Sequence, residues 1–140
     1  MALQPYIRKA HYYETDQMGI IHHSNYLRWF EEARVDLMDQ VGFGYKRMEE
    51  EGLASPVLEF TCTYQSMVRF GDTVRIWAVI KAFTGAKMVV GYRVEDLETG
   101  ELRTVGESKH CFVDRDGKPV SVKRVNPQVF ALFRQYVCEE

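Results

Sequence analysis

The sequence lacks the features that would assign it to several broad classes of protein. It has only three cysteines in 140 residues, Cys62, Cys111 and Cys138, which are far apart and odd in number. This spacing contains no CxxC pair, so it supports neither a disulfide framework nor a cysteine-based metal or redox motif. We therefore expect reduced thiols and a cytoplasmic protein.

Long apolar runs and an excess of one charge are also missing. No stretch approaches the roughly 18 apolar residues of a spanning helix, and residues 1–10 lack the apolar core of a signal peptide. The net charge is −2, and the 27% of charged residues are of both signs and interspersed. We therefore expect no nucleic-acid partner and no membrane insertion.

Linkers, internal repeats and low-complexity segments are absent from the sequence as well. A chain of 140 residues that is 46% hydrophobic can sustain one core, because it buries roughly two thirds of its unfolded surface. The sequence therefore predicts a single domain over residues 1–140.

The clearest periodicity in the sequence predicts a helix over Asn25–Val41. Apolar side chains recur there every three or four residues, which places them on one helical face. Ser24 or Asn25 is a candidate N-cap, and Gly42 suits a left-handed C-terminal cap. A second, short helix is predicted over Tyr45–Glu51.

The residues that follow are typical of β-strands. Valine, isoleucine, threonine and aromatic residues dominate four segments: Phe60–Tyr64, Val74–Phe83, Lys87–Asp96 and Glu101–Asp114. Turn sequences separate these segments, and short connections predict antiparallel neighbours. Strict alternation in the second segment puts Ala82 on an apolar face, and Trp77 and Phe83 on a mixed face that could meet another subunit.

Two further elements complete the predicted order. A first strand is expected near Pro5–Tyr12, and Asn126-Pro127 is a typical helix start near the C-terminus. The order is then one strand, the main helix, four strands and a short helix. This predicts an α+β fold, in which a long antiparallel sheet wraps around one central helix.

The segment HYYETDQMGIIHHSNY, residues 11–26, joins the first strand to the main helix and concentrates reactive side chains. A metal site there would use His22 and His23, which are adjacent and would point apart, and a third ligand such as His11 or Asp16. A purely structural interpretation makes Asp16 part of an Asx turn and Gly19 a left-handed turn residue.

A catalytic interpretation makes Asp16 the reacting carboxylate, supported by Tyr12, His23 and the first amides of the helix. Acyl transfer needs a base or nucleophile on one side of a carbonyl group and hydrogen-bond donors at its oxygen. The first N–H groups of a helix lack intrahelical acceptors and carry partial positive charge, so this connection can supply both.

The residues YYETDQMGIIHHSNYLRWFEEAR resemble the start of the 4-hydroxybenzoyl-CoA thioesterase family, which includes acyl-CoA thioesterases associated with the Tol-Pal gene cluster and has the hotdog fold. The family pattern is matched at Tyr12, Asp16, Gly19, Ile20-Ile21, His23, Asn25-Tyr26 and Trp29. A second segment, YQSMVRFGD, is also similar, but Ser66-Met67 stands where a proline is usual. The resemblance spans about residues 6–113, and the predicted element order is the hotdog order.

This resemblance implies roles for particular residues. Asp16 would be the catalytic carboxylate, and the backbone N–H of His23 would polarise the thioester carbonyl. Tyr12 and the His23 ring would be supporting side chains, although either could instead be only structural. The expected substrate-binding residues are Gly19, Asn25 and Tyr26.

The resemblance also implies the reaction: hydrolysis of acyl-CoA thioesters to free acid and CoA, in a homodimer or homotetramer with active sites between subunits. No metal or organic cofactor is expected, because CoA is part of the substrate. One alternative is a non-catalytic acyl-CoA binding protein of the same fold, and another is a dehydratase. Asp16 argues against the first, and the missing histidine-plus-acid pair in the central helix argues against the second. The acyl preference and the choice between base and nucleophile remain open.

Overall fold

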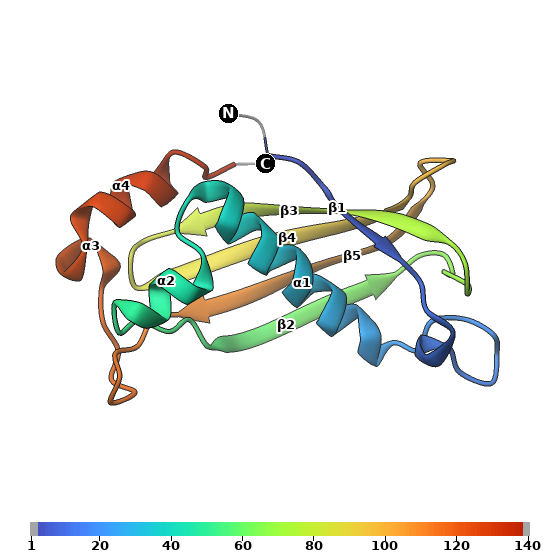
Figure 1. Cartoon of the computed structure of the whole chain (residues 1–140), viewed down its shortest axis with the longest axis horizontal. Helices are drawn as coiled ribbons and strands as arrows, with labels where there is room; N and C mark the ends of the chain where they lie inside the picture. Colours follow the sequence, from blue (N-terminus) through green and yellow to red (C-terminus); the bar gives the residue numbers. More distant parts are fainter. Residues whose placement is uncertain (1–2, 139–140) are drawn as a thin grey trace.

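The computed structural model describes residues 3–138, which form an antiparallel sheet with a long helix against one face (Figure 1). The strands are β1 (Tyr6–Lys9), β2 (Val57–Tyr64), β3 (Thr73–Phe83), β4 (Lys87–Asp96) and β5 (Leu102–Cys111). Their order across the sheet is β1-β3-β4-β5-β2, and each neighbouring pair is antiparallel. The helix α1 (Ser24–Val41) crosses one face of this sheet. The predicted α+β arrangement is confirmed.

The predicted apolar face of α1 forms the centre of the core. Its fully buried side chains include Trp29, Phe30 and Leu37, and Phe30 stacks on Tyr92 of β4 with ring centroids 4.4 Å apart. Burying an aromatic or large aliphatic side chain contributes about 1.5–3 kcal/mol. Most of the stability of α1 therefore comes from its packing on the sheet rather than from helix propensity.

The two ends of α1 differ in how well the sequence predicted them. Gly42 is the left-handed C-terminal cap as expected, with φ 101°, and the N–H groups of Gly42 and Phe43 both donate to the Met38 carbonyl. The predicted N-cap is wrong, because neither Ser24 nor Asn25 caps the helix with its side chain. Instead, the backbone N–H of Ser24 donates to Nδ1 of His22 at 3.2 Å.

The first strand is shorter than predicted. It ends at Lys9, and Tyr12–Glu14 forms a 3₁₀ turn instead of continuing the strand. The turn brings the Glu14 carboxylate back onto the backbone N–H of His11 at 2.8 Å, while the N–H of Glu14 donates to the His11 carbonyl at 3.0 Å. These local bonds replace the sheet pairing that alternation alone would have extended to Tyr12.

The predicted faces of β3 are wrong at its C-terminal end. The pairing register with β4 shifts between Ile80 and Ala82, so one extra residue, Lys81, enters the strand. A bulge of this kind exchanges the two faces of the residues that follow it. Ala82 is therefore exposed and Phe83 is buried in the core, whereas Trp77, before the bulge, stays on the outer face as predicted.

The remaining helices gather at the end of the sheet opposite the start of α1 (Figure 1). They are α2 (Tyr45–Glu50), α3 (Val122–Val125) and α4 (Pro127–Arg134). The helix start predicted at Asn126-Pro127 is confirmed, because Oδ1 of Asn126 accepts the N–H of Val129 at 3.1 Å. No helix within residues 3–138 is both long and apolar enough to cross a membrane.

Candidate active site

The connection between β1 and α1 contains a small hairpin that positions Asp16. The N–H of His22 donates to the Glu14 carbonyl, Thr15 bridges Ile21, and the N–H of Asp16 donates to the Ile20 carbonyl. Gln17, Met18 and Gly19 form the three-residue tip. Gly19 has φ 77°, the left-handed conformation that such a tip needs at its last position. The hairpin presents Asp16 at the base of its tip.

The returning arm of this hairpin pairs with a distant segment. The backbones of Ile20 and Arg69 form an isolated antiparallel β-bridge, and the N–H of Ile21 donates to the Val68 carbonyl at 2.8 Å. This pairing encloses a cavity of about 270 Å³ between the hairpin, the first turn of α1 and the end of β2. The lining residues are Asp16, Met18, Ile20, Ile21, His23, Tyr26, Tyr64, Gln65, Ser66, Met67 and Val68.

The Asp16 carboxylate is held at one oxygen only. Its Oδ1 accepts the backbone N–H of Met18 at 2.8 Å, which is the Asx turn of the structural interpretation. Within the part of the chain that the structure describes, Oδ2 has no hydrogen-bond partner. The structural and catalytic interpretations are therefore compatible, because one oxygen orients the group and the other faces no protein donor.

The first turn of α1 leaves one backbone donor without an acceptor. The N–H of Ser24 donates to the His22 ring, and those of Asn25 and Tyr26 donate to the carbonyls of His22 and His23. Among residues 3–138, the N–H of His23 has no acceptor. This donor lies at the positive end of the helix and belongs to a residue that lines the cavity.

Two aromatic side chains, Tyr26 and Tyr64, form part of the cavity wall. Tyr26 is buried, with its ring centroid 5.1 Å from that of Tyr64 in an edge-to-face contact. Burial raises the pKa of the Tyr26 hydroxyl, and burial also raises the pKa of Tyr64. The Tyr64 hydroxyl donates to the His23 carbonyl at 3.3 Å, so β2 is tied to the start of α1 at the edge of the cavity.

The structure brings together only some of the residues that the sequence singled out. Asp16, His23 and Tyr26 line the cavity, whereas Tyr12, Gly19 and Asn25 do not. Tyr12 is 75% exposed, and its ring packs edge-to-face on Phe70. Gly19 lies at the hairpin tip, and Nδ2 of Asn25 donates to the Glu14 carbonyl at 2.8 Å. The substrate contacts expected of Gly19 and Asn25, and the supporting role of Tyr12, stay predictions.

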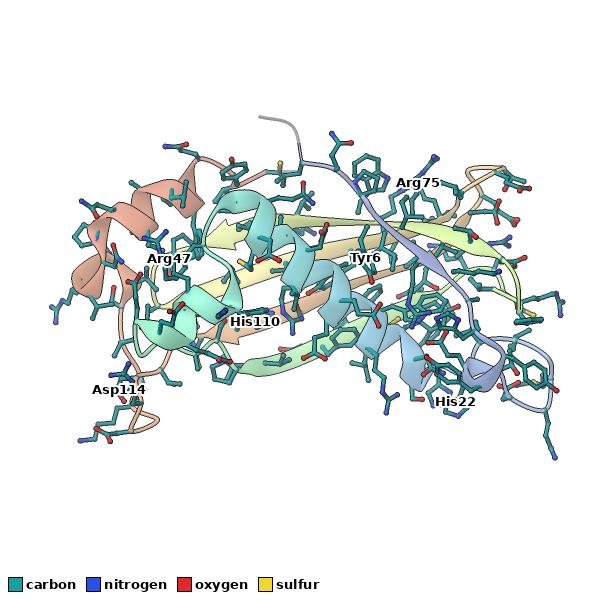
Figure 2. All side chains as sticks on the ribbon, in the orientation of Figure 1. Tyr6, His22, Arg47, Arg75, His110 and Asp114 are labelled. Atoms are coloured by element: carbon teal, nitrogen blue, oxygen red, sulfur yellow. The ribbon has the colours of Figure 1, made fainter. Side chains whose placement is uncertain are left out.

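The histidines of the connection contact one another and the backbone. The rings of His22 and His23 stack with centroids 4.1 Å apart, and Nδ1 of His22 lies 2.8 Å from Oγ of Ser24. Figure 2 shows His22 at the start of α1, beside the hairpin. Across the described residues, no three histidine, cysteine or acidic side chains are grouped in a way that could hold a metal ion.

The segment Tyr64–Val68 supplies much of the cavity wall and was not expected to do so. The N–H of Ser66 donates to the Arg103 carbonyl at 3.0 Å, a bond that the proline usual in this segment of the family could not make. Met67 beside it is 56% exposed and lines the cavity. The N–H of Gln65 donates to the same carbonyl at 2.8 Å, so Ser66 adds to an existing tie between this wall and β5, and Met67 adds a flexible apolar side chain to the wall.

Comparisons with known proteins identify the family of this chain. The family model described as the thioesterase-like superfamily matches residues 11–131. The protein YneP of Bacillus subtilis strain 168 is 37% identical over 120 residues, which cover 85% of this chain and 86% of YneP. The acyl-CoA thioester hydrolase YbgC of Escherichia coli O6:H1 is 26% identical over 127 residues, covering 91% of this chain and 92% of YbgC.

Solved structures show the same fold. The DHNA-CoA thioesterase of Staphylococcus aureus superposes with a TM-score of 0.89 and 31% identity, covering 94% of this chain and 89% of that protein. The chain therefore belongs to the thioesterase-like superfamily and has the hotdog fold.

Proposed function

We propose that this thioesterase hydrolyses acyl-CoA thioesters to a free acid and CoA, using Asp16 as the reacting carboxylate and the N–H of His23 as the donor to the thioester carbonyl. The observation that carries the proposal is that two residues lining one cavity each have a group without a protein partner among residues 3–138: a carboxylate oxygen of Asp16 and the backbone N–H of His23 at the start of α1. The names of YbgC and of the Staphylococcus aureus structure support the choice of a CoA thioester.

The proposed chemistry places opposite charges on two sides of the substrate carbonyl. As a nucleophile adds to the carbonyl carbon, the oxygen becomes negative and is stabilised by the N–H of His23 and the positive end of α1. The tetrahedral intermediate then expels the CoA thiolate, which takes a proton, and the acyl group leaves as an acid. No metal or organic cofactor takes part in these steps.

Asp16 can supply the nucleophile in two ways. As a general base it would remove a proton from water, which adds to the carbonyl carbon. As a nucleophile its carboxylate would form an acyl anhydride, which water then hydrolyses. After a single turnover in H₂¹⁸O, label in the Asp16 carboxylate identifies the anhydride route, because water has then attacked the Asp16 carbonyl of the anhydride. The base route puts the label in the acid product and leaves the protein unlabelled.

The phosphates of CoA need positive charge near the cavity mouth. Arg93 and Arg103 are already paired, with Glu95 and Asp96 respectively. The backbone of Arg69 pairs with that of Ile20, which lines the cavity, and the Arg69 side chain is exposed. Its guanidinium has no hydrogen-bond or ion-pair partner among residues 3–138. Arg69 is therefore the basic residue that we assign to a CoA phosphate.

We also propose that the chain forms a homodimer through the free edge of β2, with further assembly to a homotetramer. Among residues 3–138, strand β2 pairs with β5 alone, so its other edge presents unpaired backbone groups along Val57–Tyr64. Val57, Leu58 and Tyr64 on this strand are each about half exposed. A second copy on this edge would lie directly beside the cavity. A cytoplasmic location is part of the same proposal.

The Asp16→Asn variant tests the catalytic assignment against a panel of aliphatic and aromatic acyl-CoAs. The substitution keeps an acceptor for the Met18 N–H but removes the charge. We expect kcat to fall by about 10²–10⁴, the usual contribution of general acid–base catalysis, with the melting temperature nearly unchanged. Wild-type turnover by Asp16→Asn would refute the assignment. Binding of acyl-CoA by the wild type without any turnover would identify a binding protein instead.

A further inference from the structure

We propose that Glu14 is a positioning residue: its buried carboxylate fixes the hairpin that carries Asp16 against the start of α1. This inference rests on the proposed function, because it concerns the placement of the reacting carboxylate. Glu14 does not line the cavity and so does not touch the substrate itself. Its effect is exerted through the backbone and through Asp16.

The Glu14 carboxylate is 2% exposed and accepts four hydrogen bonds from three different parts of the chain. Oε1 accepts the N–H of His11 at 2.8 Å and Nη1 of Arg8 at 3.0 Å. Oε2 accepts Nη2 of Arg8 and Nε1 of Trp29, each at 2.9 Å. One side chain therefore joins β1, the 3₁₀ turn and the second turn of α1.

The backbone carbonyl of Glu14 adds two more bonds at the same point. It accepts the N–H of His22 at 2.9 Å and Nδ2 of Asn25 at 2.8 Å. The first of these bonds closes the base of the hairpin, two residues before Asp16. Both arms of the hairpin are thus tied at Glu14, and the arm that leads into α1 is tied to the residues around His23.

The charges around Glu14 make this junction stiff. Burial alone would lower the pKa of the Arg8 guanidinium, but its hydrogen bond with Glu32 and the charges of Glu32 and Glu14 raise it, so Arg8 stays charged. A buried carboxylate that accepts charge-assisted bonds in two directions has little freedom to move. Removing its charge would leave the Arg8 guanidinium with one carboxylate instead of two and loosen the hairpin.

Glu32 provides a matched control on the same arginine. It accepts Nε of Arg8 at 2.8 Å and the Tyr6 hydroxyl at 2.9 Å, but it lies on α1 and makes no bond to the hairpin. Substituting Glu32 therefore also removes one carboxylate from Arg8. It leaves every contact between Glu14 and the hairpin in place.

The test compares Glu14→Gln, Glu32→Gln, Asp16→Asn and the double variant Glu14→Gln/Asp16→Asn in acyl-CoA hydrolysis and thermal unfolding. A displacement of about 1 Å in a reacting group can cost about 10²-fold in rate. We expect Glu14→Gln to lower kcat by about 10- to 100-fold with KM within threefold of wild type, and Glu32→Gln to keep kcat within twofold. Because Glu14 acts through Asp16, adding Glu14→Gln to Asp16→Asn should lower kcat by less than threefold.

Several results would overturn the inference. Wild-type kcat in folded Glu14→Gln would do so, as would equal losses in Glu14→Gln and Glu32→Gln, or a full additional loss in the double variant. If Glu14→Gln fails to fold, Trp29→Phe removes the bond to Oε2, together with part of the ring's packing on Tyr26 and Arg8, and should lower kcat three- to tenfold. An unchanged kcat there would refute the inference. Wild-type protein without activity, or fully active Asp16→Asn, would refute the proposed function instead.

Discussion

His110 should make the stability of this protein fall between pH 7 and pH 5, a range in which carboxylates change little. The residue is fully buried on β5, under the helices (Figure 2). Its Nε2 lies 2.7 Å from Oγ of Ser108, which lies 2.7 Å from the Tyr92 hydroxyl. The Tyr92 hydroxyl in turn accepts Nη1 of Arg34 at 3.0 Å, and Nδ1 of His110 lies 3.4 Å from the Ser55 carbonyl.

The direction of these hydrogen bonds determines the protonation state of His110. The guanidinium of Arg34 can only donate, so the Tyr92 hydroxyl accepts from Arg34 and donates its own O–H to Oγ of Ser108. The Ser108 hydroxyl then donates to Nε2 of His110. Nε2 must then be unprotonated, and Nδ1 carries the proton that faces Ser55. Burial, together with the nearby charge of Arg34, lowers the pKa of His110 from its ordinary 6.5 to about 4.

The size of the effect follows from linkage. Below pH 6.5 His110 is protonated in the unfolded chain, whereas in the folded protein it stays neutral until about pH 4. Acidification across this range therefore favours unfolding. A tenfold difference in proton affinity is worth about 1.4 kcal/mol, which makes the whole effect about 3 kcal/mol. About 2 kcal/mol of this should be lost between pH 7 and pH 5.

Urea unfolding followed by tryptophan fluorescence at pH 7, 6 and 5 measures this loss, at one protein concentration because assembly also contributes to stability. Glu95 and Asp96 do not interfere, because hydrogen bonding lowers the pKa values of both against the opposing effect of burial, from ordinary values of 4.5 and 3.8. His110→Gln is the control and should show a flat profile over this range. An equal slope in wild type and His110→Gln would refute the reasoning.

Two further predictions concern the sheet. Gly106→Ala should cost about 1–3 kcal/mol in thermal unfolding, because a Cβ there would lie 2.6 Å from the Thr61 carbonyl oxygen and 2.7 Å from the Phe30 ring. Gly91→Ala should cost less, because its Cβ would meet the flexible side chain of Lys81 and would touch Val79 only at the ordinary contact distance of 3.7 Å. Equal losses in the two variants would contradict this explanation. Leu58→Lys, on the free edge of β2 and at a side chain that is 53% exposed, should shift sedimentation toward the 16.3 kDa monomer. An unchanged oligomer would place the interface elsewhere.

The local sequence pattern predicted the positions of Asp16 and His23 at the site, but it did not predict the burial of Glu14. The spacing of Asp16 and His23 before an amphipathic helix pointed to one connection, and the structure does place both residues at one cavity. The importance of Glu14 could not be seen, because its burial depends on Arg8 and Trp29 arriving from two other elements. Nothing in the sequence around Glu14 distinguishes it from an exposed acid.

The sequence by itself determined α1, the antiparallel strands β3 to β5 and the turns between them, because their periodicity and turn residues act over a few neighbouring positions. Only the tertiary structure decided the bulge that buries Phe83, the end of β1 at Lys9 and the pairing of Ile20 and Ile21 with Val68 and Arg69. The bulge and the pairing of Ile20 and Ile21 depend on hydrogen bonds with distant segments of the chain. The end of β1 depends on the local bonds between His11 and Glu14, whose carboxylate is also held by Trp29 of α1. Long-range contacts leave no period in the sequence, and one of them, the pairing of Ile20 and Ile21 with Val68 and Arg69, lies at the cavity that Asp16 lines.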